Sequence, residues 1–141
     1  KIMWVKRHEP EIFEKCKKIL LPKDYVRFML TGEAATDVSD ASGMQLMNIG
    51  ERCWSEEVCE KLGIDMAMLA KLYESPEISG YVTEEASRLT GLAAGTPVVA
   101  GAGDNAAAAV GTGVVGDGGC NISLGTSGTT FISAGHFGVD P

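Results

Sequence analysis

The stretch from Pro97 to Gly113 constrains the fold of this chain more than any other. Its short apolar run, Val98 to Ala100, predicts a strand that is buried on both faces. Gly101 and Gly103 follow, and the absence of side chains there lets another backbone or a ligand approach closely. The small residues from Asn105 to Val110 then predict a helix. The stretch therefore predicts a strand, a glycine turn and a helix in immediate succession.

Asp104 is the first charged residue after this strand, and it stands where the helix begins. The unpaired N–H groups and the positive end of the helix dipole favour a carboxylate at such a position. Two interpretations fit the residue. It is either a general base that accepts a proton from a substrate or an N-cap that only stabilises the helix. The stretch alone does not decide between them.

Composition narrows the class of protein. The chain has 141 residues and a formal net charge of -7, which disfavours nonspecific binding to nucleic acid or to a membrane surface. No apolar run approaches the ~20 residues of a membrane span, and nothing resembles a signal peptide. Cys16, Cys53, Cys59 and Cys120 form no Cys-x-x-Cys pair, so we expect reduced thiols in a cytoplasmic protein and no zinc site. We also expect the sequence to be an internal fragment of a longer protein.

Proline, glycine and hydroxyl residues divide the chain before this stretch into short elements. Pro10 and Pro22 suit the first position of a helix, and Gly32 suits the end of the second of these helices. Further elements are expected as helices at 55–62, from Asp65 to Leu72 and at 83–91, and as a strand at 80–82. Alternating short helices and strands predict an α/β protein.

Apolar side chains at helical spacing predict which faces pack in the core. One such face is expected on the helix that begins at Pro10 and another on the helix that begins at Pro22. These faces comprise Ile12, Phe13, Cys16, Ile19 and Leu20 on the first helix, and Tyr25, Phe28 and Met29 on the second. We expect both faces to be buried.

The segment from Thr36 to Gly43 is short-chained and rich in oxygen atoms. The favoured interpretation is a capped turn without a ligand, in which Thr36 is the N-cap and Asp37 lies in the first turn. A divalent ion held by Asp37 and Asp40 is the alternative. No further acidic ligands follow at the spacing of a calcium-binding loop, which disfavours it.

After the predicted helix, Gly116 to Gly119 is typical of a turn. The residues 120–124 and 129–133 are both typical of strands, and Gly125 to Gly128 between them predicts a tight hairpin loop. Such a loop can offer N–H groups and two hydroxyls to phosphate oxygens, although a hairpin with no ligand also fits.

Other catalytic patterns are weak or absent. Gly101 to Ala106 fits the dinucleotide-binding pattern, but the acid expected about twenty residues later is missing, because Asp117 is too early and Asp140 too late. The two histidines, His8 and His136, lie in separate polar contexts, which disfavours a histidine-assisted hydrolase. An acid at a strand end followed by a possible phosphate loop remains the more specific combination.

Five ordered motifs over essentially the whole chain resemble those of the FGGY carbohydrate kinases. They are Leu21-Pro22-Lys23-Asp24-Tyr25, Leu30-Thr31-Gly32, Thr36-Asp37-Val38-Ser39-Asp40-Ala41-Ser42-Gly43, the segment from Gly95 to Ala107, and Ser123-Leu124-Gly125-Thr126-Ser127-Gly128. The resemblance implies the actin-like, ribonuclease-H-like fold of two α/β domains with the active site in the cleft between them. Residues 1–115 would be the later part of the first domain, and residues 116–141 the opening hairpin of the second.

The resemblance also implies roles for particular residues. Asp104 would be the catalytic base and would contact the sugar together with Asn105, while Gly125, Thr126 and Ser127 would meet the phosphates of ATP. Mg²⁺ would bridge those phosphates, as phosphoryl transfer requires. The metal ligands and the adenine site of the family lie outside these 141 residues, so we expect the fragment alone to be inactive.

The implied reaction is ATP-dependent phosphorylation of a sugar hydroxyl, with D-xylulose to D-xylulose 5-phosphate as the first expectation. The implied setting is the cytoplasm, with sugar and ATP as partners and with neither nucleic acid nor membrane. Whether the full-length protein forms a homodimer is left undecided by the sequence. The alternatives are a family kinase for ribulose, gluconate or glycerol, a sugar-binding module without turnover and, more distantly, a dinucleotide-binding enzyme.

Overall fold

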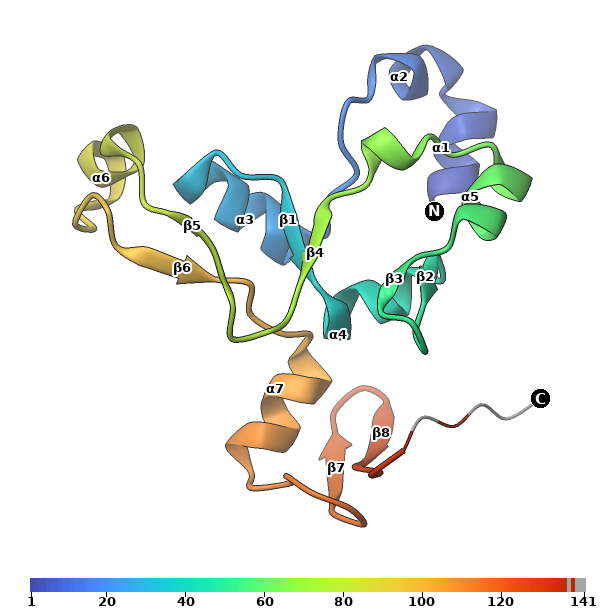
Figure 1. Cartoon of the computed structure of the whole chain (residues 1–141), viewed down its shortest axis with the longest axis vertical. Helices are drawn as coiled ribbons and strands as arrows, with labels where there is room; N and C mark the ends of the chain where they lie inside the picture. Colours follow the sequence, from blue (N-terminus) through green and yellow to red (C-terminus); the bar gives the residue numbers. More distant parts are fainter. Residues whose placement is uncertain (137, 139–141) are drawn as a thin grey trace. The chain divides into compact units, whose positions relative to one another are not determined.

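The computed structural model describes residues 1–136 and 138 (Figure 1). The chain forms two compact units, Lys1–Gly101 and Ala102–Pro141. Both helices and strands occur in each unit, which confirms the predicted α/β class. No helix in the described part of the chain is long and apolar enough to cross a membrane.

The helices of the first unit begin and end largely where the capping residues predict. They are α1 (Ile2–His8), α2 (Pro10–Lys15), α3 (Pro22–Thr31), α4 (Val38–Ala41), α5 (Glu56–Leu62) and α6 (Glu84–Thr90), with short 3-10 turns η1 (Ser42–Met44) and η2 (Met66–Met68). The Ser55 hydroxyl caps α5 and the Thr83 hydroxyl caps α6, each by accepting a backbone N–H. Gly32 ends α3 in the left-handed conformation that favours glycine.

Three two-stranded pairings complete the first unit. β1 (Ala35–Asp37) runs parallel to β4 (Lys71–Tyr73), whereas β2 (Met47–Asn48) with β3 (Cys53–Trp54) and β5 (Ile78–Tyr81) with β6 (Pro97–Val99) are antiparallel. The expectation that the apolar run of β6 is buried on both faces is wrong. Val99 is 49% exposed, and in the described part of the chain β6 pairs only with β5.

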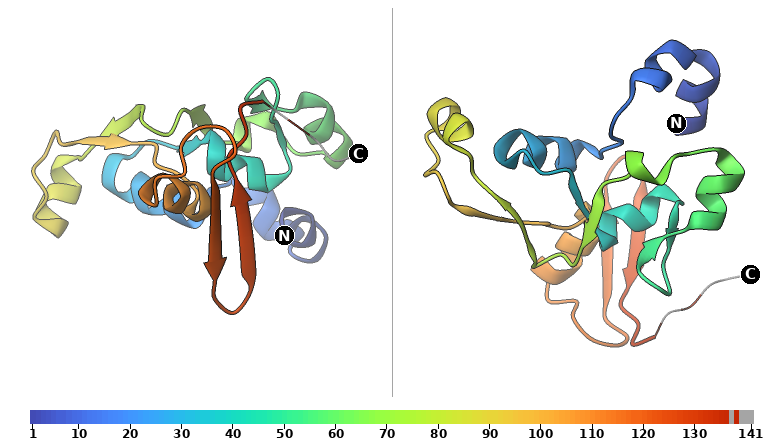
Figure 2. Two further views of the ribbon diagram at one scale, coloured as in Figure 1. Left: turned by 90° about the horizontal axis from the view of Figure 1, so that it is seen from below. Right: turned by 45° about the horizontal axis from the view of Figure 1, so that its top comes forward.

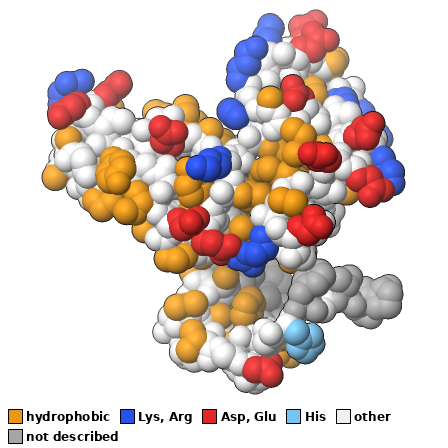
Figure 3. All heavy atoms as spheres, in the orientation of Figure 1, with side chains coloured by type: hydrophobic (Ala, Val, Ile, Leu, Met, Phe, Trp, Pro, Cys, Tyr) orange, Lys and Arg blue, Asp and Glu red, His pale blue; other side chains and the backbone are white. Residues whose placement is uncertain are grey.

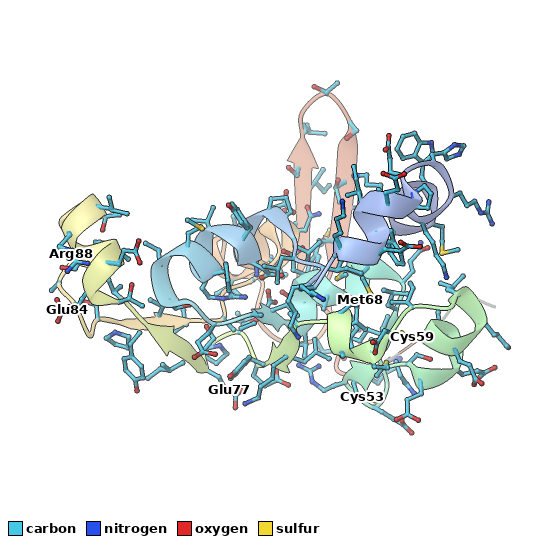
Figure 4. All side chains as sticks on the ribbon, turned by 90° about the horizontal axis from the view of Figure 1, so that it is seen from above. Cys53, Cys59, Met68, Glu77, Glu84 and Arg88 are labelled. Carbon is cyan, nitrogen blue, oxygen red and sulfur yellow. The ribbon has the colours of Figure 1, made fainter. Side chains whose placement is uncertain are left out.

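The core of the first unit is built around Leu46, Cys59, Ile64 and Leu69. Cys59 lies in this cluster (Figure 4), and burial raises the pKa of its thiol, which makes the reactive thiolate less accessible. All four cysteines are free, as expected from their spacing. A hydrogen bond joins α1 to the end of α5, because the Lys6 ammonium donates to the carbonyl of Leu62 at 2.8 Å.

Two predicted helices are shorter than expected because pairing with distant residues replaces them. The helix that begins at Pro10 ends at Lys15, and Ile19 instead donates its N–H to the Met68 carbonyl at 2.8 Å in a parallel bridge. The helix expected from Asp65 is only the turn η2, and Leu72 lies in β4 opposite Thr36. In both places a contact across the fold outweighs local helix propensity.

The predicted core faces of α2 and α3 are wrong in part. Ile12 on α2 is 60% exposed, although Phe13 on α2 and Phe28 on α3 are half-buried. Tyr25 and Met29 are 55% and 57% exposed, and the buried residues of this helix are Asp24, Arg27 and Thr31. The inner face of α3 is held by ionic contacts of Asp24 and Arg27, so Tyr25 and Met29 face outward. Figure 3 shows apolar side chains at several places on the surface of the molecule.

The second unit consists of one helix and one hairpin. The helix α7 (Asp104–Gly111) leads through the turn around Gly116 to β7 (Cys120–Leu124) and β8 (Gly128–Ile132). These strands form an antiparallel pair in which Leu124 lies opposite Gly128, so three residues close the loop (Figure 2, left). The side-chain amide of Asn121 donates to the Thr112 hydroxyl at 3.0 Å. The predicted helix and hairpin are both confirmed.

Candidate functional site

Asp104 lies at the first position of α7. Gly103, and not Asp104, occupies the N-cap position, so the interpretation of Asp104 as the N-cap is wrong. The Asp104 carboxylate accepts the backbone N–H of Asn105 at 2.7 Å, and both residues are exposed. A charged oxygen at the positive end of a helix is thus accessible to a substrate.

The turn before Asp104 depends on glycine at one position. Gly101 has a φ of +78°, in the left-handed region that other residues rarely adopt. Its N–H donates to the Ser75 carbonyl at 3.0 Å, which fixes the backbone directly after β6. Gly103, by contrast, has a φ of -60°. The predicted order of strand, glycine turn and helix is therefore confirmed, with the left-handed conformation at the first glycine.

The three predicted phosphate-binding residues form the tip of the hairpin. Gly125, Thr126 and Ser127 are all exposed, and the Gly125 N–H donates to the Ser127 carbonyl at 3.0 Å. That N–H is therefore used within the loop, whereas the two hydroxyl-bearing side chains face solvent. Within residues 1–136 and 138, no hydrogen bond or ion pair joins this loop to Asp104 or Asn105. The structure thus locates the predicted site residues but does not bring them into contact.

A buried ionic network lies in the first unit, and the sequence analysis missed it. The Lys23 ammonium lies 3.1 Å from Asp24 Oδ1, 2.6 Å from Asp37 Oδ1 and 3.7 Å from Asp40 Oδ2. Arg27 Nη2 lies 2.7 Å from Asp24 Oδ1. The side chains of Asp24 and Asp37 are at most 1% exposed. Two buried carboxylates are therefore paired with two cations, as buried charges must be.

Asp37, and not Thr36, is the N-cap in the capped turn that the sequence predicted. Its carboxylate accepts the N–H groups of Ser39 at 2.9 Å and Asp40 at 3.2 Å, and Thr36 lies inside β1. Burial alone would raise the pKa of Asp37, but the hydrogen bonds from Lys23 and Ser39 and the charge of Lys23 outweigh it and lower that pKa.

The alternative of a divalent ion between Asp37 and Asp40 is not supported. The Lys23 ammonium contacts both carboxylates and supplies the positive charge there. Burial raises the pKa of Asp40, although the charge of Lys23 acts against that shift. Among residues 1–136 and 138 no cluster of three or more His, Cys, Asp or Glu side chains could hold a metal ion.

The lowered pKa of Asp37 predicts acid sensitivity. A carboxylate whose pKa is lower in the folded state stabilises the fold above its ordinary value of about 3.9, and this contribution is lost as the pH falls through the folded pKa. We expect Asp37→Asn to lose less stability than the wild type between about pH 5 and pH 3. Urea unfolding midpoints measured across this range check the prediction, and parallel curves for the two proteins would contradict it.

The same network also binds the end of β6. Arg27 Nη1 and Lys23 Nζ both donate to the carbonyl of Ala100, the latter at 3.3 Å, and the Ala100 N–H donates to the Glu77 carbonyl at 2.8 Å. Arg27 Nη2 donates in addition to the carbonyl of Ala35, at the start of β1. One guanidinium thus links the end of β6 to the beginning of β1.

A signal for this network is present in the sequence. Asp24, Arg27 and Thr31 are spaced i, i+3 and i+7, which places them on one face of a helix. A helix face that carries polar residues ordinarily faces solvent. This pattern therefore suggests that the face with Asp24, Arg27 and Thr31 is exposed, whereas in the structure it is buried. Only the distant partner residues show that the polar face is the buried one.

Two hollows in the first unit are lined mainly by apolar side chains. The larger has a volume of about 660 Å³ and lies between α1, the Leu20–Pro22 segment and the chain around Leu46. The smaller, of about 450 Å³, lies beside Tyr25 and Phe28. None of the predicted site residues lines either hollow.

Known proteins similar to this chain are carbohydrate kinases. Residues 1–111 match the N-terminal domain of the FGGY family of carbohydrate kinases. A xylulose kinase from Escherichia coli (strain K12) is 47% identical over 137 residues, which are 97% of this chain and 28% of that protein. A solved xyloylose kinase from Brucella ovis is 42% identical with a TM-score of 0.88, over 95% of this chain and 28% of that one.

A kinase for a different substrate has the same fold. Plasmodium falciparum glycerol kinase, solved with ADP, is 26% identical with a TM-score of 0.83, over 93% of this chain and 26% of that one. These structural matches confirm the predicted actin-like fold. The chain spans about 28% of the length of the Escherichia coli relative. Fold alone does not distinguish among the substrates of such enzymes.

Proposed function

Because the chain belongs to the FGGY family of carbohydrate kinases, we propose that it is part of an ATP-dependent kinase that converts D-xylulose to D-xylulose 5-phosphate. The observation that supports this most is the 47% identity to a xylulose kinase over 137 of the 141 residues. Similarity of this extent includes every motif singled out in the sequence. In this proposal residues 1–115 belong to the first domain of the kinase and residues 116–141 open the second.

Asp104 is the proposed general base. Phosphoryl transfer needs little covalent chemistry from the protein, and positioning and charge stabilisation dominate it. The carboxylate of Asp104 accepts the proton of the sugar hydroxyl as that oxygen attacks the terminal phosphate of ATP. Asn105, the next residue on α7, contacts the sugar. The exposed position of both side chains at the start of the helix supports these roles.

The tip of the β7–β8 hairpin is the proposed contact with the phosphates of ATP. The hydroxyls of Thr126 and Ser127 are exposed donors that suit phosphate oxygens, whereas Gly125 allows the backbone to approach them closely. Mg²⁺ would neutralise the phosphates when bound. We assign its ligands to parts of the kinase outside this chain, which spans about 28% of the Escherichia coli relative.

Turnover of a panel of acceptors by the full-length protein tests the proposed function. ADP release is measured with ATP and D-xylulose, ribulose, gluconate or glycerol, and we expect the highest kcat/KM with D-xylulose. A higher value with another acceptor would keep the family and correct the substrate. Sugar binding without ADP release would indicate a module without turnover, and quenching or enhancement of nicotinamide fluorescence would indicate a dinucleotide-binding enzyme.

Thr126→Val tests the hairpin. The substitution keeps the shape of the side chain and removes the hydroxyl, so it should weaken the handling of ATP by about 1.5–3 kcal/mol, the worth of one hydrogen bond to a charged group. We expect kcat/KM for ATP to fall by about 10-fold to 150-fold, with sugar binding nearly unchanged.

The matched control is Thr130→Val, which removes an exposed hydroxyl from β8 of the same hairpin. It should leave the kinetics close to those of the wild type. Equal values for Thr126→Val, Thr130→Val and the wild type would mean that the loop serves only to close the hairpin.

A further inference from the structure

The end of α7 is joined to the beginning of the β7–β8 hairpin within the unit Ala102–Pro141 (Figure 1). The side-chain amide of Asn121 on β7 donates to the hydroxyl of Thr112, the C-cap of α7, at 3.0 Å. That hydroxyl in turn donates to the Ala108 carbonyl at 2.8 Å. A chain of two hydrogen bonds therefore runs from the strand to the last turn of the helix.

Close packing supports the same connection. A Cβ atom at Gly119, directly before β7, would lie 3.0 Å from Val114 Cγ1, so glycine lets the base of the hairpin approach the segment after α7. The Val114 N–H donates to the carbonyl of Ala109, a buried residue of α7, at 2.8 Å. Thr112 and Val114 on one side, and Gly119 and Asn121 on the other, form what we call the joint.

The hairpin extends as one ladder from its tip to this joint. Beyond the last pair of β7 and β8, the Ser133 N–H donates to the Gly119 carbonyl at 2.9 Å, and the Gly118 N–H donates to the Ser133 carbonyl at 2.8 Å. Asn121 lies opposite Phe131, and both are half-buried. A change at the joint therefore moves the hairpin as a whole.

The proposed functional residues lie at the ends of these two elements that are remote from the joint. Asp104 begins α7, which has eight residues and a length of about 12 Å. Thr126 follows β7, which has five residues and a length of about 17 Å. A rotation of the hairpin by roughly 5° about the joint would move its tip by about 1.5 Å. A misplacement of about 1 Å can cost ~10² in rate.

We propose that Asn121 is a positioning residue of the kinase, whose hydrogen bond to Thr112 sets the angle between α7 and the hairpin. It thereby sets the separation of the base on α7 from the phosphate contact at the hairpin tip. The inference rests on the proposed functions of Asp104 and Thr126. In the proposed division of domains after residue 115, the same bond joins the first domain to the second.

Asn121→Leu in the full-length enzyme keeps the approximate size of the side chain and removes the hydrogen bond. We expect kcat to fall by about 3-fold to 10-fold, which is the factor that one neutral hydrogen bond contributes to an equilibrium. The KM values for the sugar and for ATP should stay within about 2-fold of the wild type, because each substrate keeps its own contacts.

Three further variants separate the hydrogen bond from other effects. Thr112→Val removes the acceptor and should lower kcat as Asn121→Leu does, whereas Thr112→Ser keeps the hydroxyl and should retain the wild-type kcat. The matched control is Asn48→Leu, which removes an exposed side-chain amide that donates to Glu51 at 3.1 Å in the other unit. It should also retain the wild-type kcat.

Double-mutant cycles distinguish positioning from a general loss of stability. Asn121→Leu combined with Thr112→Val should be no slower than either variant alone, since both remove the same bond. In an Asp104→Asn background, Asn121→Leu should cause no further loss, because no base is left to position. A merely structural role would lower kcat in that background as well. Losses that multiply in either cycle would overturn the inference.

The measurements use the acceptor that the wild type phosphorylates with the highest kcat/KM, so a correction of the sugar leaves the inference intact. A wild-type kcat in Asn121→Leu and Thr112→Val would overturn the inference alone. ADP release by the wild type with none of the acceptors would overturn the proposed function, and the inference with it.

Discussion

Arg27→Met is expected to destabilise the protein by about 3–5 kcal/mol, the usual cost of removing one partner from a buried ion pair. The guanidinium pairs with Asp24 at 2.7 Å and donates to the carbonyls of Ala35 and Ala100. All four residues are at most 4% exposed. The substitution removes the side-chain donor of the buried Ala35 carbonyl, leaves the Ala100 carbonyl with Lys23 as its remaining cationic donor, and leaves Asp24 with a weaker counter-charge.

We expect the melting temperature of the full-length protein to fall by an amount on the order of 10 °C. Arg52→Met is the matched control. The Arg52 guanidinium also pairs with a carboxylate, and its hydrogen bond lowers the pKa of Glu74, but the two side chains are 53% and 48% exposed. Such a pair contributes about 1 kcal/mol at most. Equal melting temperatures for the two variants would contradict the buried network.

Local signals in the sequence predicted most element boundaries. Ser55 and Thr83 cap the helices α5 and α6 through their own hydroxyls, and Gly32 and Gly91 end helices in the left-handed conformation. These signals succeed because capping is a contact between residues at most four apart in the chain. The hairpin loop at Gly125 follows from the same kind of short-range pattern.

Features decided by distant contacts were not predictable in the same way. Tyr25 and Met29 look like core residues, yet α3 turns them outward because Arg27 reaches Ala100, 73 residues away in the chain. Leu72 fits a helix by spacing and lies in a strand because Thr36 pairs with it. Neither partner can be recognised from a local window, since both lie on other elements.

The candidate site was predicted only in part for a related reason. The motif around Asp104 locates the residue, and the structure places it one position inside α7, beyond the N-cap. That the carboxylate of Asp104 and the hairpin tip at Thr126 act on the same pair of substrates is a proposal, and no hydrogen bond joins them in the described residues. Lys23 was missed because its partner carboxylate, Asp37, lies 14 residues away in the chain.

Asp104→Asn is expected to lower kcat of the full-length enzyme by at least ~10², because an amide cannot accept the hydroxyl proton. The side chains are nearly equal in shape, and the Asn oxygen can still accept the N–H of Asn105. The fold and sugar binding should therefore survive, and the melting temperature should stay close to that of the wild type. Asp65→Asn is the control, since Asp65 also accepts a backbone N–H, from Ala67 at 2.8 Å, and lies in the other unit.

Single-turnover transfer of the terminal phosphate of ATP to D-xylulose tests the role of Asp104 most directly. Rapid-quench measurement with excess full-length enzyme follows the chemical step without interference from product release. We predict that the wild type and Asp65→Asn form xylulose 5-phosphate at the same rate and that Asp104→Asn forms it at least ~10² more slowly. Equal rates for all three proteins would contradict the assignment of Asp104 as the general base.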